Sequence, residues 1–139
     1  YSRLFSNVRE RMSLCYYCSA SSVRYKGLLT VDSGVETANA EKAQNEILNQ
    51  LEIIKKGEFT DFEFDASVKS ICDSLSTYYD SQNSLDLWYA LKINNQNLYS
   101  PKDIAEKIKK ITREDVILAA KGVKLHTVYK LLPKEGPIC

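Results

Sequence analysis

The sequence predicts an α+β domain in which an antiparallel sheet is covered by helices. A helix end opens the chain, two extended segments follow it, and about five helices precede one late extended segment. Strands segregated from helices in this way are typical of α+β domains. The length of 139 residues and the apolar fraction of 44% suffice for one domain with its own core. We therefore treat residues 1–139 as a single domain.

The first elements are predicted to be a helix end and a β-hairpin. Apolar side chains recur at helical spacing in residues 3–12. Residues 14–20 are expected to be extended, and residues 27–35 form a second predicted strand after a turn at residues 21–24. Two strands so close together in the chain predict an antiparallel hairpin.

Two long helices are expected next, each with its own start or stop signal. Asn39 is a candidate N-cap and Gly57 a C-terminal glycine for the first helix. Thr60 and Glu63 have the spacing of a capping box for the second helix. Each helix carries an apolar stripe that we expect to be buried, namely Ala43, Ile47, Leu51 and Ile54 in the first, and Phe64, Val68, Ile71, Leu75 and Tyr78 in the second.

Three shorter helices and a strand complete the prediction. A third helix runs from Ser84 through Leu91, and residues 94–97 are expected to form a loop. Ser100 and Pro101 open a fourth helix, and Thr112 caps a fifth helix that stops at Gly122. Residues 124–132 are predicted as a strand of the same sheet as the hairpin. Three strands make a thin sheet, so we expect further sequence upstream.

Charge and hydropathy argue against nucleic acid and membrane partners. The net charge is +1 but is unevenly distributed. Residues 1–57 contain eight basic and six acidic side chains, residues 58–91 contain one basic and seven acidic, and residues 92–139 contain ten basic and five acidic. In the basic last third, lysines alternate with isoleucines at helical spacing, which is typical of a solvated helix face rather than of a nucleic-acid footprint. No apolar run approaches the roughly 20 residues that cross a bilayer.

The chain lacks the residues of most catalytic and metal sites. Its one histidine, His126, cannot build a histidine-based zinc site, and the sequence contains no H-E-x-x-H, H-x-x-E-H or G-x-S-x-G motif. Cys15 and Cys18 form a C-x-x-C, but no second pair follows, and odd spacing in a strand sends side chains to opposite faces. We therefore expect no metal or cofactor in this chain, and reduced cysteines in a cytoplasmic protein.

A block near the start of the chain resembles a known family. Residues 2–16 resemble the S-R-L-F-x-x-x-R-E-x-x-x-L-x-Y segment in the second domain of insulinase-type (pitrilysin, processing-peptidase) metallopeptidases, which are inverzincins. The similarity continues in the same order through residues 26–34, through the joint at residues 57–60, and through a T-x-E-D-V block at residues 112–116. The resemblance implies that the chain is the C-terminal portion of such a second domain.

The resemblance carries two site residues over by position. Arg9 and Tyr16 match the arginine and tyrosine of R-x4-L-x-Y, which implies that Arg9 binds substrate backbone carbonyls and that the Tyr16 hydroxyl supports the developing oxyanion. The family's zinc motif, H-x-x-E-H, belongs to another domain, so zinc is expected on a partner domain or subunit. For the same reason we expect no catalytic residue in this chain. The residues alone, without the resemblance, favour a structural role, in which Arg9 pairs with a surface carboxylate and Tyr16 is half-buried packing.

Three kinds of parent protein fit this reading. The first is a zinc-free partner subunit that completes the site of an active peptidase. The sequence of residues 14–17 resembles bacterial subunits of this kind more than it resembles catalytic subunits. The second is a complete zinc metalloendopeptidase with H-x-x-E-H upstream. The third is a non-catalytic scaffold, although retention of Arg9 and Tyr16 argues against it. The expected partners are a peptide substrate and a zinc-bearing peptidase domain or subunit.

Overall fold

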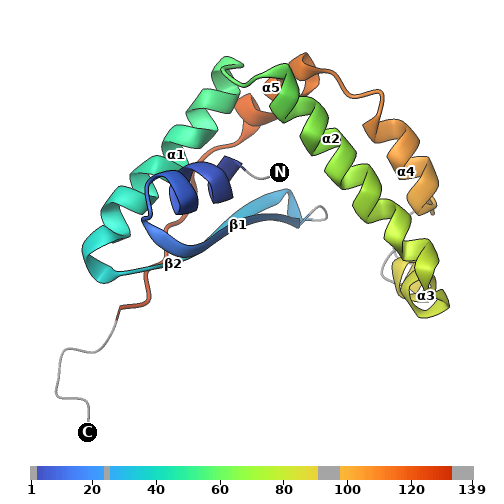
Figure 1. Cartoon of the computed structure of the whole chain (residues 1–139), viewed down its shortest axis with the longest axis horizontal. Helices are drawn as coiled ribbons and strands as arrows, with labels where there is room; N and C mark the ends of the chain where they lie inside the picture. The colour runs from blue at the N-terminus through green and yellow to red at the C-terminus, as the bar shows by residue number, and fades with distance from the viewer. Residues whose placement is uncertain (1–2, 24–25, 91–97, 133–139) are drawn as a thin grey trace, which may run out of the picture.

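The computed structural model describes residues 3–23, 26–90 and 98–132. A hairpin, η1 and α1 form one side of the molecule, α2, α3 and α4 form the other, and α5 packs on α1 (Figure 1). Helices and a two-stranded antiparallel sheet confirm the predicted α+β class. The elements are η1 (Leu4–Arg11), β1 (Cys15–Val23), β2 (Leu28–Val35), η3 (Thr37–Asn39), α1 (Ala40–Lys56), α2 (Asp61–Ser76), η4 (Thr77–Asp80), α3 (Gln82–Ala90), α4 (Pro101–Ile108) and α5 (Arg113–Gly122).

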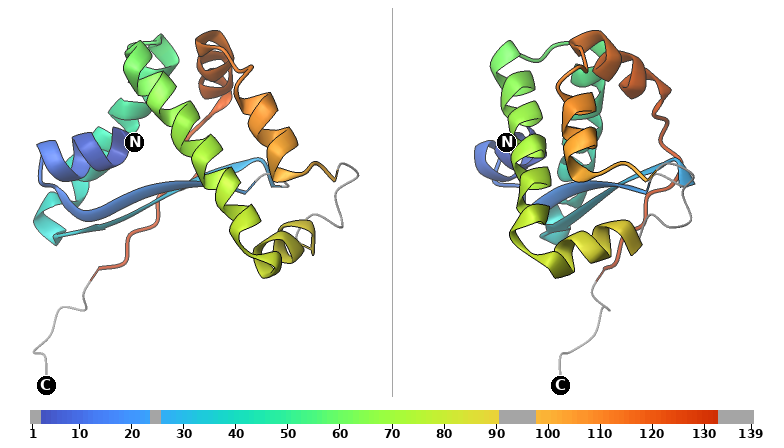
Figure 2. Two further views of the ribbon diagram at one scale, coloured as in Figure 1. Left: turned by 45° about the vertical axis from the view of Figure 1, so that its right-hand side comes forward. Right: turned by 90° about the vertical axis from the view of Figure 1, so that its right-hand side faces the viewer.

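The predicted hairpin is confirmed, with one face against helices. β1 and β2 pair antiparallel, and η1 and α1 lie on the same side of the hairpin (Figure 2). A small core joins the three parts, because Val8 of η1, Leu14, Cys18 of β1 and Ala43 of α1 are all buried together. The predicted turn at residues 21–24 is too early, since β1 continues to Val23.

The prediction of a third strand at residues 124–132 is wrong. This segment has no regular secondary structure, and its side chains are exposed throughout. After α5 the chain runs past the hairpin without joining it (Figure 1). An alternating pattern favours an extended backbone, but a strand also needs the edge of another strand to bond to, and that partner is never encoded in the segment itself.

Local helix signals are confirmed at most of the predicted positions. Gly57 ends α1 with φ 75° and donates its N–H to Ile53 and Ile54. Capping boxes at Thr60, Ser100 and Thr112 open α2, α4 and α5. Asn39 precedes α1 as predicted but makes no side-chain cap, because it ends the 3-10 turn η3 with an almost helical backbone.

The apolar stripes are buried less evenly than predicted. Ala43 and Leu75 are buried, but Ile71 is 47% exposed, because α2 packs mainly on α4 and leaves another of its faces to solvent. Aromatic side chains join α3 to η4 and to the segment that precedes α4. Tyr78 and Trp88 meet edge to face with ring centroids 4.7 Å apart, and the Trp88 indole N–H donates to the Tyr99 carbonyl. The predicted loop at residues 94–97 lies outside the described residues.

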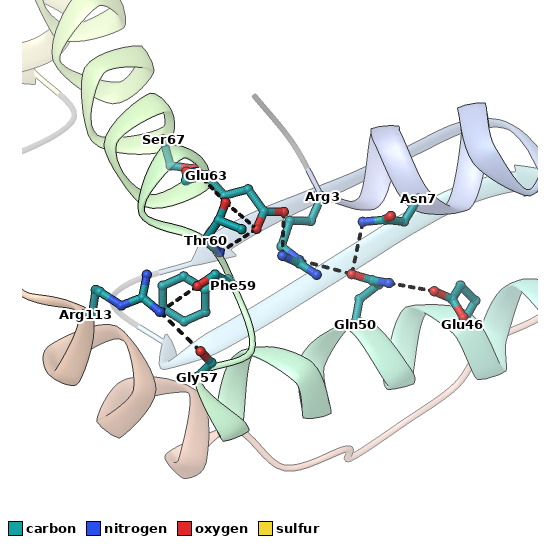
Figure 3. A network of polar contacts seen from close by, with 10 residues as sticks. All are labelled: Arg3, Asn7, Glu46, Gln50, Gly57, Phe59, Thr60, Glu63, Ser67 and Arg113. Atoms are coloured by element: carbon teal, nitrogen blue, oxygen red, sulfur yellow. Dashed lines mark hydrogen bonds and ion pairs between the residues drawn. The ribbon is translucent and has the colours of Figure 1, made fainter.

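A polar network ties η1 to both long helices. The side chain of Gln50 in α1 is buried, and its Oε1 accepts hydrogen bonds from Arg3 Nε at 3.1 Å and Asn7 Nδ2 at 3.2 Å (Figure 3). Gln50 Nε2 donates to Glu46 at 2.6 Å. Arg3 also forms an ion pair with Glu63 at the start of α2. Because buried polar groups need such partners, the network fixes how η1 lies on the fold.

The Glu63 carboxylate responds to this arrangement. Its burial by itself would raise its pKa, but hydrogen bonds from the Thr60 amide and hydroxyl and the positive charge of Arg3 outweigh that effect. The pKa of Glu63 therefore lies below its ordinary value, and the side chain is ionised at neutral pH. The Glu63 carboxylate thus accepts from Thr60 in the cap of α2 and also anchors Arg3.

Replacing Gly57 with Ala should destabilise the joint between α1 and α2. Residue 57 has a left-handed backbone, which is strained for an alanine. A Cβ added there would also lie 2.8 Å from Ile117 Cδ1. We expect the free energy of unfolding to fall by about 1–2 kcal/mol. Urea unfolding followed by the fluorescence of Trp88 measures the change. Gly122→Ala is the matched control, because an added Cβ there meets nothing within 4 Å; equal losses in the two variants would contradict the prediction.

Candidate functional site

A cavity of about 320 Å³ lies where η1 ends, β1 begins and the chain leaves β2 toward α1. Its volume is within the range of about 300–1,000 Å³ typical of ligand pockets. Both residues predicted to bind substrate are among its walls. The lining residues are Arg9, Ser13, Leu14, Cys15, Tyr16, Glu36 and Asn39.

Arg9 reaches the cavity from the last turns of η1. Its guanidinium carbon lies 4.7 Å above the centre of the Phe5 ring, one helical turn earlier. This cation–π contact restricts the side chain without neutralising its charge. Arg9 is exposed and takes part in none of the ion pairs found among the described residues. The charge of the guanidinium is therefore not neutralised by any of the ion pairs among the described residues.

A β-bulge places Tyr16 in the cavity wall. Cys15 pairs with Val35 and Tyr17 with Gly34, so Tyr16 is the extra residue on β1. A bulge of this kind redirects one side chain out of the regular alternation. The Tyr16 ring is 69% exposed, and its hydroxyl donates a hydrogen bond of 3.2 Å to Glu36 Oε1. Tyr16 is therefore an exposed side chain whose hydroxyl is bonded to Glu36, not half-buried packing.

The turn that joins η1 to β1 is strained. Ser13 has φ 50°, a left-handed backbone that is uncommon for a residue with a side chain, and it lines the cavity. Leu14 next to it donates its backbone N–H to the Val8 carbonyl at 3.2 Å and is buried. The buried Leu14 thus holds the turn in place and keeps Arg9 and Tyr16 on one side of it.

Sequence reasoning missed Glu36 and Asn39 as cavity residues. Both follow β2, and the pairing of Cys15 with Val35 brings them beside the start of β1. The predicted hairpin could have shown this neighbourhood, but only with its register known. Asn39 adds an amide that makes no cap bond to α1, so the cavity contains polar groups of both charges and of neutral character.

The prediction that Cys15 and Cys18 point to opposite faces is wrong. The bulge adds one residue between them, so they pair with Val35 and Ser33, which lie two positions apart and hence on one face of β2. Both cysteines belong to the same small core, with Cys18 buried. Burial, followed by the charge of neighbouring Cys15, raises the pKa of the Cys18 thiol, although a hydrogen bond with Ser33 opposes the shift.

The two cysteines should therefore differ in reactivity. We expect iodoacetamide at pH 8 to alkylate Cys15 at least about tenfold faster than Cys18, because Cys15 lines the cavity while Cys18 is buried and holds its proton more tightly. Peptide mass mapping over a time course measures the two rates. Unfolding in urea is the control and should make the rates similar. Equal rates in the folded protein would contradict the assignment.

Other candidate sites contribute little. His126 lies in the exposed segment after α5, where its Nδ1 is 2.7 Å from the Thr127 hydroxyl oxygen, and it is not a cavity residue. Within residues 3–23, 26–90 and 98–132, no three histidine, cysteine or acidic side chains gather as metal ligands would. None of the described helices has both the length and the apolar character needed to span a membrane.

Comparisons with known proteins agree with this architecture. Residues 1–71 match the family described as the peptidase M16 inactive domain. A probable inactive metalloprotease of Bacillus subtilis, YmfF, is 32% identical over 98% of this chain, which spans 32% of that protein. The chain thus covers about a third of that relative.

Two crystal structures have a similar fold. A conserved protein from Enterococcus faecalis superposes with a TM-score of 0.75 and 26% identity, over 86% of this chain and 28% of the other. A protease from Helicobacter pylori superposes with a TM-score of 0.74 and 21% identity, over 86% of this chain and 30% of the other. The second similarity concerns the fold alone.

Proposed function

The chain belongs to the peptidase M16 (insulinase) family as its inactive domain, and from this premise we propose that it lends side chains to a zinc site carried by another domain or subunit. In this proposal Arg9 binds the substrate and Tyr16 supports the oxyanion. The observation that carries the proposal is that one cavity contains both side chains, each accessible and Arg9 without an ion-pair partner among the described residues.

Arg9 suits the binding of a peptide backbone. A guanidinium is permanently charged and presents several donors in a rigid plane, so it can hold two carbonyl oxygens of an extended peptide. The stack on Phe5 restricts the side chain before substrate arrives, which lowers the entropy lost on binding. Arg9 would thus act on the bound substrate before and during the reaction.

Tyr16 suits the stabilisation of negative charge that develops on the scissile carbonyl. During peptide hydrolysis the oxygen of the scissile carbonyl gains negative charge, and a hydroxyl donor near it would lower the energy of that state. The zinc of the other domain or subunit would supply the activated water. The Tyr16 hydroxyl already donates a hydrogen bond to a carboxylate oxygen, that of Glu36. Exchanging one oxyanion acceptor for another requires only a rotation of the hydroxyl and a small movement of an exposed ring.

We favour a zinc-free subunit as the parent protein. The similarity to YmfF, described as a probable inactive metalloprotease, supports this choice over a complete protease. A zinc metalloendopeptidase with H-x-x-E-H upstream is the alternative, and a non-catalytic scaffold is the third candidate. The sequence upstream of residue 1 separates the first two, because an H-x-x-E-H there would make the parent a protease.

The surface of the chain supports association with further protein. Many large apolar side chains of the described residues are exposed to solvent, which is costly in water unless other protein covers them. We propose that the chain is the C-terminal portion of a larger second domain, in a cytoplasmic protein, and that a zinc-bearing domain faces the cavity. Exposed apolar side chains include Tyr17, Leu29, Leu118, Tyr129 and Leu131.

The test is peptide hydrolysis by the full-length parent with its zinc-bearing subunit, comparing wild type with Tyr16→Phe and Arg9→Ala. Lower turnover in the first variant and weaker substrate binding in the second would support the proposal. If both variants keep full activity while the complex stays assembled, the scaffold reading replaces it.

A further inference from the structure

The bulge in β1 brings two free cysteines of this strand onto the same face. Cys15 pairs with Val35 and Cys18 with Ser33, so three steps along β1 match only two steps along β2. A strand rises about 3.3 Å per residue, so two steps separate the cysteines by about 6.6 Å instead of the ~10 Å of three regular steps. Disulfides join residues whose Cα atoms lie about 4.4–6.8 Å apart, so the bulge brings the pair within bonding range.

The two thiols share one core but differ in their access to solvent. Cys18 is 5% exposed inside the small core, whereas Cys15 packs against that core and also lines the cavity. Burial raises the pKa of the Cys18 thiol, and the neighbouring Cys15 thiol raises it further, so the two side chains lie close enough to interact. A small solute in the cavity therefore meets Cys15 first, with the Cys18 thiol behind it.

We propose that Cys15 and Cys18 form an oxidation site, which hydrogen peroxide converts reversibly into an intrachain disulfide. The peroxide first oxidises the Cys15 thiol to a sulfenic acid, and its second oxygen leaves as water. The Cys18 sulfur then attacks the Cys15 sulfur, the S–O bond breaks, and the hydroxyl leaves with the Cys18 proton as a second water. Two thiols are thus oxidised to one disulfide, and one peroxide is reduced to two waters.

Closing this bond fixes the bulge. The ring that it forms contains Tyr16 and Tyr17 and joins the residues on either side of the extra position in β1. A covalent ring restricts the conformations of the residues that it encloses. Because Tyr16 lines the cavity, the redox state of the pair sets how freely that part of the cavity wall moves. This inference does not depend on a role for Tyr16 in hydrolysis.

The test maps the thiols of the full-length parent protein after exposure to hydrogen peroxide. Free thiols are blocked with N-ethylmaleimide, and trypsin, which cuts after Arg11 and Arg24, keeps both cysteines in one peptide. In wild type we expect peptide 12–24 to carry no maleimide and to be two hydrogen atoms lighter than its reduced, unblocked form. A phosphine reductant should restore both thiols.

Two variants separate the roles of the cysteines, and a third cysteine is the control. In Cys18→Ala the sulfenic acid on Cys15 has no thiol behind it, so dimedone should trap it. In Cys15→Ser the buried Cys18 should keep its thiol over the same time course. Cys72 of α2, whose thiol contacts the Ala105 carbonyl at 3.9 Å, should also remain free for alkylation.

Amide hydrogen exchange of residues 14–18 measures the effect on the bulge. We expect slower exchange in the oxidised wild type than in the reduced protein or in Cys18→Ala treated with the same peroxide. Two free thiols after treatment, or a sulfenic acid on Cys15 that persists in wild type, would overturn the oxidation site. Unaltered exchange in protein that contains the disulfide would overturn its effect on the bulge. Failure of the proposed function is a separate result, since it would appear as unaltered hydrolysis in Tyr16→Phe.

Discussion

Tyr16→Phe is expected to lower kcat of the parent complex by about a hundredfold or more. The substitution removes one hydroxyl donor to the oxyanion and leaves the ring, and loss of such a donor typically has this effect. KM should change little, because the hydroxyl acts mainly on charge that appears in the transition state. The measurement is steady-state hydrolysis of a neutral quenched-fluorescent peptide by the full-length parent with its zinc-bearing subunit.

The neighbouring tyrosine is a matched control. Tyr17 lies on the same strand and is 54% exposed, but it does not line the cavity and its ring lies over Gly34. Tyr17→Phe should therefore leave kcat unaltered. Arg9→Ala should mainly raise KM, because the guanidinium binds the substrate both before and in the transition state. Neither Tyr16→Phe nor Arg9→Ala should destabilise the fold much, since both side chains are exposed.

Equal kcat values for Tyr16→Phe and Tyr17→Phe would contradict the assignment of Tyr16. In that case the role of Tyr16 would be structural, as the extra residue of the bulge in β1. A loss of activity accompanied by dissociation of the subunits would instead assign the effect to assembly, so size-exclusion chromatography of each variant accompanies the assay.

Gln50→Ala is expected to lower the free energy of unfolding by about 2–3 kcal/mol. The change leaves the partly buried Arg3 Nε, Asn7 Nδ2 and a Glu46 oxygen without the buried side chain that they share as a partner. η1 then loses its polar attachment to α1, and the cavity wall that carries Arg9 loses its support. Urea unfolding followed by the fluorescence of Trp88 measures the loss.

Asn49→Ala tests the same kind of change outside the network. Asn49 is the next residue back on α1, also an amide, and its Nδ2 donates to Glu46 Oε2 at 3.2 Å in an exposed position. Its replacement should cost no more than about 0.5 kcal/mol. If Gln50→Ala and Asn49→Ala are equally mild, water replaces the network easily and Gln50 does not hold η1.

Sequence patterns were sufficient wherever the interaction spans a few residues. The caps at Thr60, Ser100 and Thr112 each join a hydroxyl to an amide three positions later, and the left-handed end of α1 needs only a glycine. The hairpin followed from two extended segments that are close in the chain. The family resemblance at residues 2–16 pointed to Arg9 and Tyr16 on the same basis, as a short motif.

The tertiary structure decided everything that depends on pairing between distant segments. The bulge at Tyr16 shifts the strand register by one residue, and this shift places Cys15 and Cys18 on one face and turns Tyr16 toward Glu36. Gln50 lies 47 residues from Arg3 in the sequence, and no local pattern shows that they meet. For the same reason residues 124–132, extended by pattern, form no strand here: a sheet requires a partner edge, and which edges lie within reach is a property of the folded chain.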